Sequence, residues 1–173
     1  MSPAHIILAA VTLQRLVELV VSRRNAARLI AQGGIEVGRQ HYPAIVALHA
    51  AWLAALWLLV PADTVIRWPF LGLFLVLQVG RIWVLWHLGR YWTTRIITLP
   101  GAPLVAGGPY RFCRHPNYVV VVGEIATLPL ALGQWPVALL FSLLNAAVLI
   151  ERIRVENAAL ATRRRDSQSA VGG

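Results

Sequence analysis

The sequence predicts an all-α integral membrane protein with about five transmembrane helices, and three observations support this fold class. Of the 173 residues, 58% are hydrophobic and 13% are charged, whereas a soluble domain has roughly 25% charged residues. The apolar residues gather in segments long enough to cross a bilayer. The connections between these segments are short, so the chain has little room for a separate soluble domain.

Five apolar segments are expected to form the spans, and each is bounded by a recognisable break. The first is followed by a run of arginines, and the second is separated from the third by a turn that starts at Pro61. The fourth begins at Pro116, because proline favours the first turn of a helix. A short Gly-Gln-Trp-Pro turn precedes the fifth. The five spans are residues 3–21, 44–60, 68–88, 116–132 and 137–150.

Three of these spans contain charged side chains, which are costly in hydrocarbon unless they are paired. Arg15 and Glu18 are three residues apart, so they can form an ion pair on one face of the first helix. Glu124 lies about two turns into the fourth span, and Arg81 in the third span is its expected partner. We interpret the role of Glu124 as structural.

The fifth helix is expected to continue beyond the membrane through residues 151–161, because no glycine or proline stops it there. Residues 163–173 are rich in arginine and small polar residues, and we expect a disordered basic and polar tail. The sequence therefore predicts a single transmembrane domain, residues 1–162, followed by this tail.

The net charge of +9 comes from sixteen basic residues, all of them arginine. A basic chain can bind nucleic acid, but these arginines flank apolar segments and form no soluble face, so the positive-inside effect explains them better. We expect five spans, with the amino terminus outside and the carboxyl terminus in the cytoplasm. The opposite side has Arg67, whereas the cytoplasmic side has Arg23, Arg24, Arg28, Arg39, Arg90, Arg95, Arg111, Arg114, Arg152, Arg154 and residues 163–165.

The most polar segment is residues 108–118 (GPYRFCRHPNY), directly before the fourth span. The loop before it, residues 99–110, has three prolines and three glycines, and such irregular backbone at a membrane must be satisfied by protein or by a ligand. Asn117 lies in the first turn of the fourth helix, where free backbone donors favour an anionic group. His115 and Tyr118 are three residues apart and face the same way. Snorkelling arginines and an aromatic belt would explain single residues of this segment, but not its His-Pro pair.

A second polar cluster follows the fifth span at residues 151–157 (ERIRVEN). Arg152 and Glu156 are four residues apart and share a helical face, while Arg154 points away. Together the two clusters offer cationic, anionic and aromatic groups at one cytoplasmic mouth, which suits a zwitterionic aromatic molecule. The sequence has no phosphate-loop or metal-ligand spacing, and its single cysteine, Cys113, excludes an intrachain disulfide.

The two clusters together resemble the isoprenylcysteine carboxyl methyltransferase family. Two motifs support the resemblance: Gly-Pro-Tyr-Arg-x-x-Arg-His-Pro-x-Tyr at residues 108–118 and Arg-x-Arg-x-Glu at residues 152–156. The similarity covers roughly residues 90–160. Membrane phospholipid methyltransferases share much of the first motif. Residues 22–25 (SRRN) and 41–43 (HYP) resemble a small bacterial branch whose members are thought to methylate alkylpyrones and similar long-chain polyketides. The resemblance implies a cytoplasmic cofactor-binding loop and S-adenosyl-L-methionine as the methyl donor.

The resemblance also implies roles for individual residues. Arg152 is implied at the carboxylate or oxyanion of the acceptor, as the catalytic residue. The chain departs from the family at Val120, where many members have glycine, and at Asn157, where many have a second acid; both departures weaken the case for a prenylcysteine substrate. The implied donor-binding residues are Ala102, Pro103, Leu104, Val105, Tyr110, His115, Pro116, Asn117, Tyr118 and Glu156.

We therefore expect an S-adenosylmethionine-dependent enzyme that methylates an oxygen, either a carboxylate or an enol or phenol, of a lipophilic acceptor. Such an oxygen arrives largely ionised, so the protein has mainly to orient it and exclude water. If a base is needed, His115 is the nearest candidate. The alternatives are a phospholipid-type N-methyltransferase and a non-catalytic small membrane protein. The expected partners are the acceptor and membrane lipid, with no nucleic acid and no metal.

Overall fold

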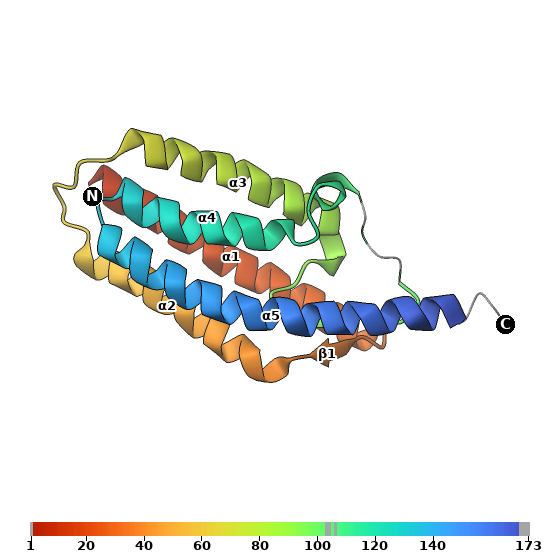
Figure 1. Ribbon diagram of the computed structural model, residues 1–173. Helices are drawn as coiled ribbons and strands as arrows, with labels where there is room; N and C mark the ends of the chain where they lie inside the picture. The colour runs from red at the N-terminus through yellow and green to blue at the C-terminus, as the bar shows by residue number, and fades with distance from the viewer. Residues whose placement is uncertain (1, 103–104, 106, 170–173) are drawn as a thin grey trace.

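The computed structural model describes residues 2–102, 105 and 107–169, with side chains as far as Ala161. These residues form five α-helices in an up-and-down bundle, and a two-stranded sheet lies at one end of it (Figure 1). The helices are α1 Pro3–Ala31, α2 Tyr42–Leu59, α3 Trp68–Leu88, α4 Pro116–Ala131 and α5 Trp135–Ser169. The strands are β1 Ile35–Val37 and β2 Ile96–Thr98, and the 3₁₀ helices are η1 Arg39–His41, η2 Gly89–Tyr91 and η3 Gly108–Arg111.

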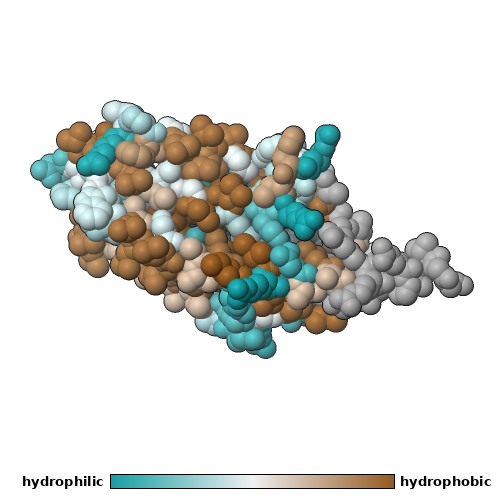
Figure 2. Space-filling model, in the orientation of Figure 1, coloured by the Kyte–Doolittle hydropathy of each residue, from teal (hydrophilic) through white to brown (hydrophobic). Residues whose placement is uncertain are grey.

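The expected membrane fold is confirmed. Helices α1, α2, α3 and α5 are long and apolar enough to cross a bilayer, while α4 is an apolar helix of 16 residues. Large apolar side chains cover the outer faces of the bundle, as a lipid-facing surface requires, and polar groups gather toward the end that carries the sheet (Figure 2). Among the most exposed apolar side chains are Leu13, Leu58, Val76, Trp86 and Leu143.

Helix α4 packs against both α3 and α5, and nine of its side chains are buried. The contact with α3 is closest at Gly123, where a Cβ would lie 2.6 Å from a methyl carbon of Leu77. The apolar core continues from α4 to α1 and α2, where Leu8 and Trp52 are almost fully buried. Because α4 is central in the bundle, its first turn, which belongs to the predicted motif, lies next to α5.

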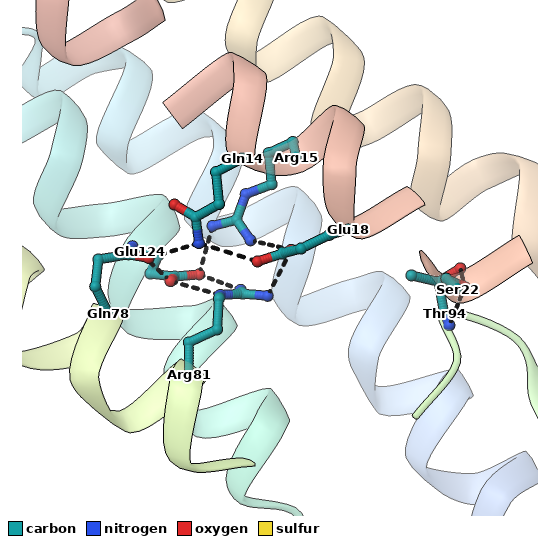
Figure 3. A network of polar contacts seen from close by, with 8 residues as sticks. All are labelled: Gln14, Arg15, Glu18, Ser22, Gln78, Arg81, Thr94 and Glu124. Atoms are coloured by element: carbon teal, nitrogen blue, oxygen red, sulfur yellow. Dashed lines mark hydrogen bonds and ion pairs between the residues drawn. The ribbon is translucent and has the colours of Figure 1, made fainter. Parts of the chain in front are cut away.

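Four charged residues from α1, α3 and α4 form one network in the middle of the bundle (Figure 3). Glu124 accepts bonds from Arg81 through both carboxylate oxygens, from Arg15 at 2.8 Å and from Gln78 at 2.8 Å. Glu18 accepts from Arg15 at 2.8 Å and from Arg81 at 3.1 Å. The predicted pairs Arg15–Glu18 and Arg81–Glu124 are both present, and two arginines with two glutamates leave the network neutral.

Three features lie outside the sequence expectations. Helix α1 continues to Ala31 through the arginines that follow the first span. Helix α5 continues to Ser169, into the segment expected to be a disordered tail, since no glycine or proline interrupts it before residue 172. Strands β1 and β2 pair antiparallel with Glu36 opposite Ile97, and the ion pair between Glu36 and Arg95, at 3.2 Å, crosses the same sheet.

Candidate functional site

A cavity of about 870 Å³ lies at the end of the bundle where β2, η3, α4 and α5 meet. It is lined by seven of the ten residues expected to bind a donor: Ala102, Val105, Tyr110, His115, Asn117, Tyr118 and Glu156. Pro116 is buried as the first residue of α4 and is absent from the lining. Pro103 and Leu104 lie outside the described residues. Arg152, expected at the acceptor, also lines this cavity.

A chain of hydrogen bonds joins the two sequence motifs at the cavity wall. The Tyr118 hydroxyl donates a short hydrogen bond to a carboxylate oxygen of Glu156 and accepts one from Nε of Arg152 at 2.8 Å. Arg152 is 9% exposed, and its Nη2 donates to the carbonyl oxygen of Thr94 at 2.7 Å. Arg152 and Glu156 therefore share a helical face, as the spacing predicts, and Tyr118 connects them.

Thr94 connects this cavity wall to helices α1 and α2 by hydrogen bonds. Its backbone N–H donates to Oγ of Ser22 on α1 at 2.8 Å, and its hydroxyl donates to the hydroxyl of Tyr42 on α2 at 3.2 Å. Ser22 is almost fully buried. Since the carbonyl of Thr94 accepts from Arg152, one residue of the β2 loop places α1, α2 and α5 at a common level.

His115 and Asn157 form a second link between the motifs. Nε2 of His115 and Oδ1 of Asn157 are 3.0 Å apart, so the imidazole N–H donates to the amide oxygen. The imidazole also stacks on the ring of Tyr118, with the centroids 5.4 Å apart. Asn157, where the family often has an acid, thus fixes the orientation of His115. Burial, with the Glu156 carboxylate adding to it, raises the pKa of Tyr110, so this phenol is a neutral hydroxyl at the cavity.

A second cavity of about 230 Å³ extends from the same wall into the middle of the bundle. Most of its lining is apolar and comes from α1, α2 and α5, with residues such as Leu19, Val46 and Leu149. The two cavities share five residues: Trp92, Thr93, Asn117, Tyr118 and Arg152. Within this shared wall, Oδ1 of Asn117 is buried and has no hydrogen-bond partner among the residues that the structure describes. A polar ligand and an apolar ligand would therefore meet at this wall.

The turn into η3 requires a glycine at residue 108. Gly108 has φ +57°, a conformation that residues with a Cβ rarely adopt. A Cβ there would also lie 2.2 Å from the imidazole of His87 at the end of α3. This close approach places Pro109 and Tyr110 against the end of α3.

We expect Gly108→Ala to destabilise the protein by about 1–3 kcal/mol, the usual cost of forcing a side chain into the left-handed region. Thermal unfolding in detergent measures the effect. Gly107→Ala is the matched control, because Gly107 has φ −86° and its Cβ would meet His87 at an ordinary 3.9 Å. Equal melting temperatures for the two variants would contradict this account of the turn.

The sequence analysis assigned no role in the site to residues 92–94 or to Tyr42. Trp92 and Thr93 line both cavities, and Thr94 acts through a backbone carbonyl, which leaves no trace in the residue type. The run Trp-Thr-Thr-Arg after the third span is an available signal, because an aromatic, two hydroxyl and one basic side chain are adjacent there. Among the residues searched for a metal site, no three His, Cys, Asp or Glu side chains lie close enough to hold an ion.

The fold and the site define a class: a multi-helix membrane protein with a polar and an apolar cavity that meet at one wall. The chain belongs to the isoprenylcysteine carboxyl methyltransferase family, whose sequence model matches residues 70–162, more than half of its length. It is therefore a membrane methyltransferase by family.

Two relatives cover nearly the whole chain. An uncharacterized protein of Bacillus subtilis (strain 168), YpbQ, is 38% identical over 159 residues, which are 90% of this chain and 95% of that protein. An uncharacterized protein of Haemophilus influenzae is 25% identical over 163 residues, 90% of this chain and 94% of that protein. No solved structure matches the chain significantly.

Proposed function

We propose that this protein transfers a methyl group from S-adenosylmethionine to an oxygen of a lipophilic acceptor. The observation that carries the proposal is the wall shared by the two cavities, in which Asn117, Tyr118 and Arg152 each face both. Methyl transfer needs a polar donor and an apolar acceptor held with their reacting atoms adjacent and water excluded. A polar cavity and an apolar cavity with one common wall meet this requirement.

The larger cavity fits the donor by its chemistry. Glu156 provides a carboxylate for a cationic group, and Oδ1 of Asn117 is a buried acceptor to which no described residue donates. Tyr110, His115 and Tyr118 provide aromatic rings and a neutral hydroxyl for an adenosyl group. When bound, S-adenosylmethionine supplies a sulfonium methyl group that an oxygen nucleophile can take without further activation. The other donor-binding assignments, Ala102, Val105 and Pro116, rest on the family motif, as do Pro103 and Leu104.

We assign to Arg152 the role of binding the acceptor oxygen. Its Nε and Nη2 are bonded to Tyr118 and Thr94, and Nη1 has no hydrogen-bond partner among the described residues. The guanidinium is therefore held in place by two bonds and has one nitrogen left to orient an anionic oxygen. A carboxylate or ionised enol arrives without its proton, so no base is required. His115, which donates to Asn157, is then a positioning residue that stacks on Tyr118.

The apolar cavity, the two departures from the family motif and the arginines support a class of acceptor and a location of the protein in the cell. The apolar cavity accepts a hydrocarbon chain, and the departures at Val120 and Asn157 favour a long-chain polyketide, such as an alkylpyrone, over a prenylcysteine. The arginines gathered at the sheet end of the bundle support a cytoplasmic orientation of that end, on the side where the donor is available. Both relatives come from bacteria, which supports the bacterial cytoplasmic membrane.

Donor binding is the direct test of this function. We expect the purified protein to bind S-adenosylhomocysteine in calorimetry, and Glu156→Ala to weaken that binding about tenfold or more, because a charge-assisted contact is lost and Tyr118 loses its acceptor. Glu151→Ala is the control, since its carboxylate is half-exposed and pairs at 3.8 Å with the exposed Arg154. A folded wild-type protein that does not bind S-adenosylhomocysteine would support a non-catalytic membrane protein, and methylation of an amine would support the N-methyltransferase alternative.

A further inference from the structure

The apolar cavity contains a ring of polar side chains well below the wall where methyl transfer is proposed. Arg15 on α1, His49 on α2 and Asn145 on α5 all line it. Buried polar groups in a membrane bundle mark a site or a partner, because lipid cannot satisfy them. None of the three is needed for the donor, which occupies the other cavity in the proposed function.

The three side chains lie at one depth. Ser22, Tyr42 and Arg152 are at a common level, because all three bond to Thr94. Arg15, His49 and Asn145 each lie seven residues further into the bundle on the same three helices, which is about 10 Å at 1.5 Å per residue. Three helices thus place one polar residue each about 10 Å deeper along the helix axes than Arg152.

This deep ring has unused hydrogen-bonding capacity. Asn145 is 2% exposed, and its amide has no partner among the described residues. Nε of Arg15 is buried without a partner in the described part of the chain, as is Nε1 of Trp52, which lines the same cavity. His49 donates from Nδ1 to the carbonyl of Ile45 at 2.8 Å, so in its neutral form Nε2 remains an acceptor. Unpaired buried donors are expensive, so an occupant that satisfies them is favoured.

The charge of the ring selects the chemistry of that occupant. Arg15 belongs to the network of Figure 3, in which two arginines are balanced by Glu18 and Glu124. A net charge of zero provides no excess attraction for an anion. The remaining groups are mostly N–H donors, with one amide oxygen and one imidazole nitrogen as acceptors. The ring therefore matches a neutral oxygen, either a carbonyl or a hydroxyl, on a chain that is otherwise apolar.

We propose that Arg15, His49, Trp52 and Asn145 form a second polar subsite, which binds a neutral carbonyl or hydroxyl on the acceptor's chain about 10 Å from the oxygen that is methylated. The proposal rests on the proposed function, because it assigns the apolar cavity to the acceptor. It specifies the substrate class further: an oxygenated chain is preferred over a plain hydrocarbon chain.

The test measures chain binding without the donor. The probes are a series of long-chain carboxylic acids, one unsubstituted and the others with a single keto group at successive positions, titrated into the protein in nanodiscs by calorimetry. We expect one keto position to bind about tenfold more tightly than the unsubstituted acid. We expect Asn145→Leu and His49→Phe to lose this preference, whereas Trp57→Phe, an aromatic change on α2 outside the cavity, keeps it.

Folding of the key variant is checked in the same preparation. Asn145→Leu replaces an unpaired buried amide with an apolar side chain of similar size, so its melting temperature is expected to rise while the keto preference is lost. Equal affinity for all the acids in the wild-type protein, absence of acid binding, or a preference that survives in both variants would overturn the subsite. Absence of S-adenosylhomocysteine binding by the wild-type protein would instead contradict the proposed function. Because acid binding and S-adenosylhomocysteine binding are measured in separate titrations, failure of the subsite can be told from failure of the proposed function.

Discussion

Glu124→Leu is expected to prevent accumulation of folded protein, the largest stability effect in the molecule. The Glu124 side chain is 2% exposed and accepts bonds from Arg15, Gln78 and Arg81. Its loss leaves the two arginines with Glu18 as their remaining carboxylate, an uncompensated charge in an apolar bundle. Breaking a buried pair in this way costs about 3–5 kcal/mol. Yield of monodisperse protein and thermal unfolding in detergent measure the effect.

Two variants control this experiment. Glu151→Leu removes a carboxylate that is half-exposed, and it is expected to have little effect on stability. Glu124→Gln keeps the shape of the side chain and part of its hydrogen bonding, so its stability should lie between those of the wild type and Glu124→Leu. If Glu124→Gln folded normally but abolished turnover at saturating donor, the structural role of Glu124 would be wrong.

Arg152→Lys is expected to reduce methyl transfer by about tenfold or more while S-adenosylhomocysteine affinity stays nearly unchanged. Lysine keeps the positive charge, but its single ammonium cannot bond Tyr118 and Thr94 and still orient an acceptor oxygen. One charge-assisted contact is worth about 1.5–3 kcal/mol, which corresponds to this loss of rate. Single-turnover methylation and donor titration on one preparation measure the two quantities.

Arg154→Lys is the matched control, because Arg154 lies two residues further along α5 with its side chain 74% exposed. We expect it to leave both quantities unchanged. If Arg152→Lys lost donor affinity in parallel with activity, Arg152 would act in the donor site through Tyr118 and Glu156. The acceptor oxygen would then have to be assigned to Arg154 or to Arg95, of which Arg95 lines the larger cavity.

The sequence predicted those features whose cause is local or chemically restrictive. Helix α3 runs over residues 68–88 as expected, because its apolar length, Pro69 in its first turn and Gly89 at its end define it. The pair Arg81–Glu124 was predictable across helices, since a buried carboxylate must find a cation and few are available. The placement of the first-motif residues His115 and Tyr118 beside α5 also matched the expectation.

Other features depend on contacts that no local pattern encodes. Strands of three residues, such as β1 and β2, are too short to show an alternating pattern, so the sheet was not predicted. The link from Arg15 to Glu124 joins residues 109 apart in sequence, and the i,i+3 pair with Glu18 already seemed to satisfy Arg15. Thr94 contributes a carbonyl to Arg152, a role that any residue at this position would share.

The charged network also determines where the bundle can open to the bilayer. It fastens α1, α3 and α4 to one another by ion pairs, and separating these helices would expose charge to lipid tails. The hydrogen bonds of α2 with other elements that the structure describes lie near its ends, at Tyr42, Trp57 and Leu59, and α2 is the least buried of the four long helices. Between those ends α2 is held by apolar packing, which acyl chains can replace at little cost. A lipid chain can therefore enter the apolar cavity laterally past α2, without crossing the aqueous phase.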